Sequence, residues 1–138
     1  MKKGMSPVAE ERLIRVRISA SDAHYGGGLV DGARVLELIG DAVTEVLIRH
    51  DGDEGLMRAY SEVEFLAPVR SGDFLEVRAH LEKVGDTSRT VRCTAHKVIE
   101  LASQGGSAAR VLREPQLVAR AIAVAVAPTT RRRPAGRP

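Results

Sequence analysis

The feature that most constrains the fold of this chain is a change in hydrophobic period along it. From Leu29 to Arg49, apolar residues recur with the helical period of about 3.6 residues and cover one half of the cylinder. Before and after this segment the period is two, as in strands with one buried face. A helix with so wide an apolar face must pack on a broad surface, and the strands provide it.

The segments of period two number five. One, residues 12–18, precedes the helix, and four follow it, at residues 57–67, 74–84, 88–99 and 116–126. Residues 68–73 and 85–87 are turn-forming and too short for parallel crossovers, so they predict antiparallel hairpins. Residues 101–115 are expected to form a longer loop. The pattern therefore predicts an α+β domain, with one helix on a five-stranded antiparallel sheet.

One helix covers a single face of such a sheet and leaves a strand edge open. An open edge is a template for pairing with another chain, so we expect a homodimer or higher homo-oligomer. The expected folded domain is 12–127, between a flexible N-terminus at 1–11 and a disordered Arg/Pro tail at 128–138. The tail holds four arginines, and without their charges the rest of the chain has a net charge of 3 − 4 = −1. The basic pI therefore does not indicate a nucleic-acid partner, and the 3% aromatic content argues against base stacking.

The sequence also excludes several other classes of protein. A lone cysteine, Cys93, precludes a disulfide or a cysteine-based metal site within one chain. His50, His80 and His96 lack a second ligand at metal spacing, so we predict no metal site. There is neither a membrane-length apolar run nor an N-terminal signal segment, and we expect a cytoplasmic protein without a membrane partner.

The loop before the helix is the first candidate site. Asp22, His24 and Tyr25 are three groups able to handle protons, and Gly26-Gly27-Gly28 follows them. Glycines allow backbone N–H groups to crowd near a ligand, and a helix N-terminus adds donors and a positive dipole end. Together they would hold a thioester oxygen as it becomes an enolate. The alternative, equally weighted, is an Asp-led turn with a loop histidine.

Two further candidates are acidic. Asp41 and Glu45 lie one turn apart on the polar stripe of the helix, which also carries Arg34; the alternative is a solvated face. Glu64 lies near the end of a strand beside Phe65, where partial desolvation would raise its pKa and suit it to acid–base chemistry. The alternative for Glu64 is an outward-facing carboxylate. The alternation places Tyr60 on the same strand face as Glu64.

These motifs carry a resemblance to a known family. The glycine-rich loop, the long helix and the run 65–73 resemble the hot-dog superfamily, in which a curved antiparallel sheet wraps a central helix. More specifically, the chain from about Arg17 to Arg120 resembles the 3-aminobutyryl-CoA ammonia-lyases of lysine fermentation and the related β-alanyl-CoA ammonia-lyases. The matching runs are 22–27, 29–34, 40–41, 44–47, 51–56, 63–69, 72–74, 84–89 and 97–98.

The resemblance implies the reversible elimination of ammonia from a short 3-aminoacyl-CoA, such as 3-aminobutyryl-CoA to crotonyl-CoA. It implies Asp22 and His24 as catalytic acid or base, and Asp41 or Glu64 as the carboxylate that binds the substrate ammonium, within one chain or across a subunit interface, near which the sites are expected. Tyr25 and the glycines 26–28 would bind the thioester oxygen. The reaction needs no cofactor, since coenzyme A is part of the substrate. An acyl-CoA thioesterase and a non-catalytic acyl-CoA binding domain are the alternatives.

Overall fold

The computed structural model describes residues 11–128, which form one helix and one sheet with two short 3-10 turns. The elements in chain order are β1 (Glu11–Arg17), turns at Ala20–Asp22 and Gly26–Gly28, α1 (Gly32–Asp51), β2 (Leu56–Phe65), β3 (Phe74–Val84), β4 (Ser88–Leu101) and β5 (Ala109–Val126). The predicted α+β architecture is confirmed. Of the two predicted terminal segments, residues 1–10 and 129–138 lie outside the described part, and Glu11 already belongs to β1.

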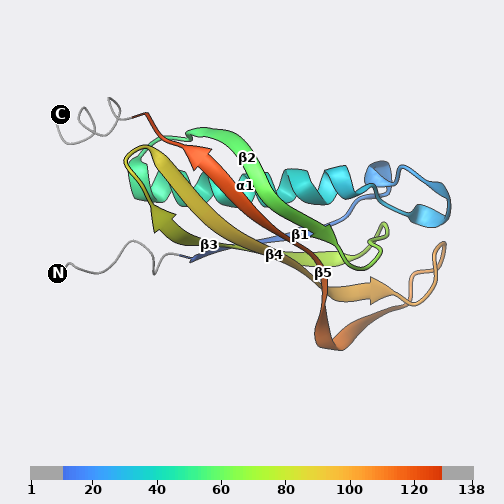
Figure 1. Ribbon diagram of the computed structural model, residues 1–138. Coiled ribbons are helices and arrows are strands. Elements are labelled where there is room, and N and C mark those ends of the chain that lie inside the picture. The colour runs from blue at the N-terminus through green and yellow to red at the C-terminus, as the bar shows by residue number, and fades with distance from the viewer. Residues whose placement is uncertain (1–10, 129–138) are drawn as a thin grey trace.

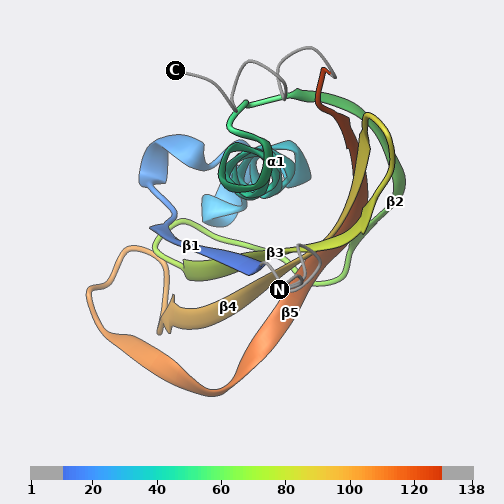
Figure 2. The same cartoon turned by 90° about the vertical axis from the view of Figure 1, so that its left-hand side faces the viewer.

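The five strands form one antiparallel sheet in the order β1-β3-β4-β5-β2. The sheet curves around α1, which lies along its concave face (Figures 1 and 2). Strands β1 and β2 are the two edges. As expected, the helix leaves the opposite face of the sheet without a covering layer among the described residues.

The core lies between α1 and the concave face of β3, β4 and β5. Period-two alternation directs every second residue of these strands inward, and many of them are alanine, which allows the helix to approach closely. The buried inward residues are Leu75, Val77, Ala79, Leu81, Val91, Cys93, Ala95, Ala119, Ala121, Ala123 and Ala125. The helix contributes Val35, Leu38, Ile39, Ala42, Val43, Val46 and Leu47.

The helix begins later than its periodicity predicted. Leu29 and Val30 are extended, since they form bridges to Arg70 and Ala23, and the Val30 N–H donates to the Val69 carbonyl. Asp31 then caps the helix by accepting a bond from the Ala33 N–H at 3.0 Å. The predicted start of the helix at Leu29, directly after the glycine triplet, is therefore wrong, and residues 29–31 separate the triplet from the helix.

The connection between β2 and β3 also differs from the prediction. Residues 68–73 do not form a hairpin, because β2 pairs with β5 at one edge while β3 pairs with β1 and β4. The chain instead crosses from one side of the sheet to the other. The predicted hairpin at 85–87 is confirmed, as β3 and β4 are antiparallel neighbours.

The expected loop at 101–115 is shorter in the structure. β5 begins at Ala109, and its first residues extend the pairing with β4, so that Leu101 lies opposite Ala109. The small residues and Gly105-Gly106 predict a loop that extends to Pro115, but Pro115 lies within β5. It is tolerated because the register jumps between Val111 and Gln116, and a proline without an N–H fits such an irregularity.

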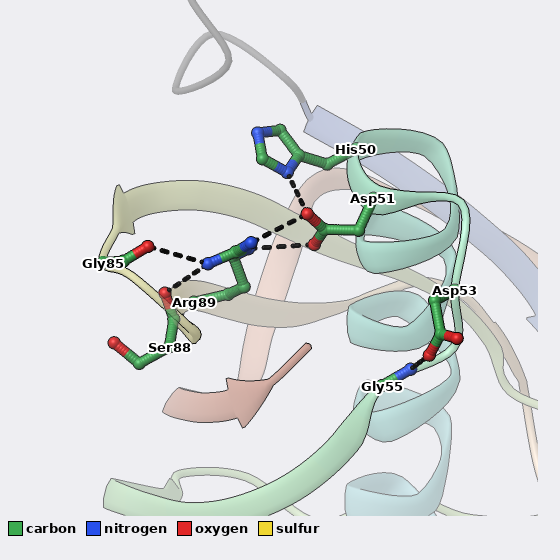
Figure 3. A network of polar contacts seen from close by, with 7 residues as sticks. All are labelled: His50, Asp51, Asp53, Gly55, Gly85, Ser88 and Arg89. Atoms are coloured by element: carbon green, nitrogen blue, oxygen red, sulfur yellow. Dashed lines mark hydrogen bonds and ion pairs between the residues drawn. The ribbon is translucent and has the colours of Figure 1, made fainter. Parts of the chain in front are cut away.

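A buried ion pair joins the end of α1 to the β3–β4 hairpin (Figure 3). Arg89 is wholly buried, and its guanidinium contacts Asp51, the last residue of the helix. It also donates to the carbonyls of Gly85 and Ser88. Because its guanidinium is buried and paired, Arg89 is neither a solvated residue nor a free cation that could bind a phosphate.

Candidate active site

A hollow of about 520 Å³ lies at the N-terminal end of α1. One wall is the start of the helix, from Asp31 to Ala33, and the other is the end of β2 and the segment after it, from Phe65 to Val69. A Cβ on Gly32 would lie 2.9 Å from the Phe65 ring, so this glycine allows the two walls to approach. The positive end of the helix dipole therefore faces a mostly apolar space.

A second hollow, of about 420 Å³, continues along α1. Ala33 lines both hollows, and together we call them the α1–β2 groove. The second hollow is lined by the polar stripe of the helix, including Glu37, Asp41 and Thr44, and by Met57 and Tyr60 of β2. An apolar groove with a row of carboxylates on one wall suits an organic cation on an apolar chain.

Tyr60 reaches the groove because β2 is irregular. Register shifts between Met57 and Ala59 and between Tyr60 and Glu62 insert extra residues, so Tyr60 lies opposite the inward Ala123. Burial raises the pKa of its hydroxyl above 10. The alternation placed Tyr60 on the same face as Glu64, which is wrong, since a bulge leaves no mark in a polar/apolar pattern.

Glu64 lies on the opposite face of the sheet from the groove. It is paired with Arg120, an outward residue of β5, and Arg120 Nε donates to its carboxylate at 2.5 Å. Both side chains are about half exposed, at 41% and 51%. Within one protomer, Glu64 is therefore separated from Asp41 by the sheet.

Asp22 binds the loop to the helix. One carboxylate oxygen accepts the Ser19 N–H at 3.0 Å, and the other lies 3.1 Å from Arg34 Nε, in an orientation that makes an ion pair but no hydrogen bond. Arg34 also donates to Glu37 at 2.8 Å. That bond, with the charges of Asp22, Glu37 and Asp41, raises the pKa of Arg34 against the opposing effect of burial. The charges of three carboxylates thus act on one guanidinium, and the net charge of this group of side chains is negative.

The glycine triplet forms a separate turn before the helix. Gly27 and Gly28 have φ of 70° and 75°, a left-handed conformation that glycine adopts readily. The carbonyl of Gly26 accepts the Leu29 N–H, and that of Gly28 accepts the Ser71 N–H. His24 and Tyr25 are exposed beside this turn, with their rings edge to face at 4.7 Å. None of these residues lines the two hollows, but Leu29, which follows the turn, lines the first.

The described residues hold no group of three or more His, Cys, Asp or Glu side chains arranged to bind a metal ion. Cys93 lies in the core, and burial raises the pKa of its thiol to about 12. No helix within residues 11–128 combines the length and the apolar character needed to cross a bilayer.

The fold and this groove define a class of protein. A model of the thioesterase superfamily matches residues 27–100, more than half of the chain, and the chain belongs to this superfamily of hot-dog folds. Within it, the chain belongs with the ammonia-lyases of CoA thioesters. It is 50% identical over 122 residues to a protein of Acetoanaerobium sticklandii named 3-aminobutyryl-CoA ammonia lyase. The aligned region covers 88% of this chain and 97% of that relative.

Solved structures agree with this placement. The β-alanyl-CoA:ammonia lyase from Clostridium propionicum superimposes with a TM-score of 0.87 at 35% identity, over 90% of this chain and 89% of that one. A hexameric hot-dog fold thioesterase of Campylobacter jejuni superimposes with a TM-score of 0.67 at 22% identity, over 84% and 81% of the two chains. At that identity the second match supports the fold alone, and the predicted hot-dog fold is confirmed.

Proposed function

We propose that this protein catalyses the reversible elimination of ammonia from a short 3-aminoacyl-CoA, 3-aminobutyryl-CoA to crotonyl-CoA, as a step of lysine fermentation. The observation that carries the proposal is the 50% identity, over nearly the whole length, to a relative named for this activity. The α1–β2 groove supports it, because it pairs apolar walls with an acidic stripe.

The chemistry requires a base, an enolate site and a cation site. The thioester acidifies the hydrogen on the carbon next to it, and a base removes that proton. The electron pair then forms the C2–C3 double bond as the C3–N bond breaks, and neutral ammonia leaves from the substrate ammonium. The base then passes its proton on, and the released ammonia is recovered as NH₄⁺. The reaction changes no oxidation state, and our proposal includes no cofactor.

The positions of the predicted site residues suggest a different role for each. Asp41, on the groove wall, binds the substrate ammonium, and the negative stripe around Arg34 favours that cation. His24, exposed beside the glycine turn, is the group available for proton transfer. Asp22 positions the loop through Ser19 and Arg34.

The remaining predicted residues differ in how well they suit the groove. The glycine turn, with Tyr25 beside it, is assigned the donors for the thioester oxygen, and it adjoins the groove only through Leu29. Glu64 is the least suited of the four predicted catalytic residues, because it is paired with Arg120 on the far face of the sheet.

The proposed working form is a homo-oligomer in the cytoplasm that binds a small acyl-CoA, without nucleic-acid or membrane partners. Strand β2 is an edge strand, and it also forms one wall of the groove. Exposed apolar side chains are present at both of its ends: Leu56 is 74% exposed and Phe65 is 53% exposed. Association of two copies along β2 would cover these residues and place the groove beside the interface.

The test is a pair of assays on the same protein sample. Incubation with crotonyl-CoA and an ammonium salt is expected to remove the absorbance of the enoyl thioester without release of a free thiol. Omission of ammonium should abolish the change. Release of coenzyme A in place of loss of the double bond would contradict the proposal.

The second candidate, an acyl-CoA thioesterase, is favoured by the superfamily that the chain matches. In that case a carboxylate such as Asp41 activates water, and coenzyme A release is independent of ammonium. The third, a non-catalytic acyl-CoA binding domain, predicts a rise in Tm with acyl-CoA but no turnover. The two assays with a thermal shift measurement separate all three.

A further inference from the structure

The side chain of Gln104 lies against the glycine turn, although the two are far apart in sequence. Gln104 belongs to the connection between β4 and β5. A Cβ built on Gly28 would lie only 2.3 Å from Gln104 Oε1 and 2.8 Å from its Cδ. The carboxamide therefore fills the space that a side chain at position 28 would need.

Ser71 joins these two residues through three hydrogen bonds. Ser71 Oγ donates to Gln104 Oε1 at 3.0 Å, and Gln104 Nε2 donates to the Ser71 carbonyl at 3.0 Å. The Ser71 N–H in turn donates to the Gly28 carbonyl at 2.8 Å. Gln104, Ser71 and Gly28 thus form one unit, here called the Gln104 clamp, which links the β4–β5 connection, the segment before β3 and the glycine turn.

The glycine turn needs such an external contact. Consecutive glycines lose the most backbone freedom on folding, and their peptide groups reorient easily unless neighbours fix them. A Cβ on Gly26 or Gly27 would meet no atom within 4 Å, so that end of the turn faces open space. The other end, at Gly28, is the one that the clamp holds.

We propose that Gln104 is a positioning residue for the ammonia-lyase reaction. Through Ser71 and its contact with Gly28, it fixes the direction of the amides of the glycine turn, which the proposed function assigns to the thioester oxygen. Donors fixed before the reaction stabilise a developing enolate without reorganisation, so their alignment affects the rate more than substrate affinity. The catalytic part of this inference rests on the proposed function, whereas the clamp itself does not.

The test compares Gln104→Ala with Ser107→Ala, a control at an exposed residue of the same connection that is not part of the Gln104 clamp. In Gln104→Ala we expect faster amide hydrogen exchange at residues 24–30, a kcat lowered by roughly 10- to 100-fold and a nearly unchanged KM. The Tm should stay close to that of the wild type, because Gln104 is exposed. The control should match the wild type in all four measurements.

Two further variants separate positioning from a general structural role. Gln104→Glu keeps the acceptor for Ser71 Oγ but loses the donor to the Ser71 carbonyl, so it should be intermediate in both exchange and kcat. Gly28→Ala would displace the carboxamide, and adding Gln104→Ala to it should change exchange little further. If Gly28→Ala does not fold, Ser71→Ala replaces it in this comparison.

Unchanged exchange at residues 24–30 in Gln104→Ala would overturn the clamp. Faster exchange with unchanged kcat would overturn the positioning role, and so would a fall in Tm with faster exchange throughout residues 11–128. Hydrogen exchange requires no substrate, so a protein without lyase activity still tests the clamp. Its failure is thereby distinguished from that of the proposed function.

Discussion

Arg89 donates two parallel hydrogen bonds to Asp51, from Nε at 2.9 Å and from Nη2 at 2.8 Å (Figure 3). Both side chains are 1% exposed. An aspartate at the last position of a helix is unfavourable to the helix dipole, and Arg89 offsets this charge while it fixes the β3–β4 hairpin to the helix. The pair thus closes the end of the core distant from the groove.

Removal of one partner should be costly. In Asp51→Asn the buried guanidinium of Arg89 loses its counter-charge, so we expect the free energy of unfolding to fall by about 3–5 kcal/mol. Glu45→Gln, which breaks the exposed pair with Arg49, should cost less than about 1 kcal/mol. Denaturant unfolding of both variants measures the difference, and equal losses would contradict the role given to Asp51.

The same pair predicts a dependence of stability on pH. Burial opposes the charge of Asp51, but the hydrogen bonds and charge of Arg89, with His50 Nδ1 at 3.0 Å, lower the pKa of the carboxyl below its ordinary 3.8. The unfolded state therefore binds more protons below this value, and the stabilisation, complete above it, is lost as pH falls through the folded pKa. The stability difference between wild type and Asp51→Asn should be constant from pH 7 to pH 5 and shrink below about pH 4. A difference that grows in acid would contradict this sign.

Asp41 provides the sharpest test of the groove. If its carboxylate binds the substrate ammonium, Asp41→Asn keeps one acceptor oxygen but removes the negative charge, and a hydrogen bond between charged groups is worth about 1.5–3 kcal/mol. The value of kcat/KM for crotonyl-CoA amination should then fall by roughly 10- to 100-fold. Glu45→Gln is again the matched control, since Glu45 lies one turn away on the same helix but does not line the groove. Equal kinetics of the two variants would remove Asp41 from the site.

Cys93 should be inert in the folded protein. Its thiol is 1% exposed and burial raises its pKa to about 12, so almost no thiolate forms near neutral pH. An aromatic disulfide reagent at pH 8 should therefore detect no protein thiol until denaturant is added, when one per chain reacts. This result also validates the assay for coenzyme A release, and rapid reaction of the native protein would contradict the buried placement.

The period of the apolar residues was sufficient to predict where the helix and most of the strands lie, but not which strands pair in the sheet. The helix α1, apart from its ends, and the strand at 74–84 follow from local pattern alone. The pairing of β2 with β5 does not, because short connections favour sequential hairpins and only the curvature of the whole sheet brings these strands together. The first part of β5 was predicted as loop because small residues and Gly105-Gly106 suggest one, and the irregular pairing that accommodates Pro115 is a tertiary feature.

The site was predicted unevenly for similar reasons. Asp41 and the glycine turn were identifiable because charge and glycine clusters are visible in a sequence. Tyr60 was missed because register shifts in β2 reverse its face, and Gln104 because its contact with Gly28 joins residues separated by most of the domain. The pairing of Glu64 with Arg120 on the outer face of the sheet was not predictable, since Arg120 lies on a strand distant in sequence.

The central claim is that a nitrogen–carbon bond forms at C3 of an enoyl-CoA on this protein. The most direct measurement is mass spectrometry of the thioester after incubation of crotonyl-CoA with ¹⁵N-labelled ammonium in D₂O. At early times the account predicts intact 3-aminobutyryl-CoA that carries ¹⁵N and one deuterium at C2. Free coenzyme A with an unlabelled acid, or crotonyl-CoA recovered unchanged, would contradict it.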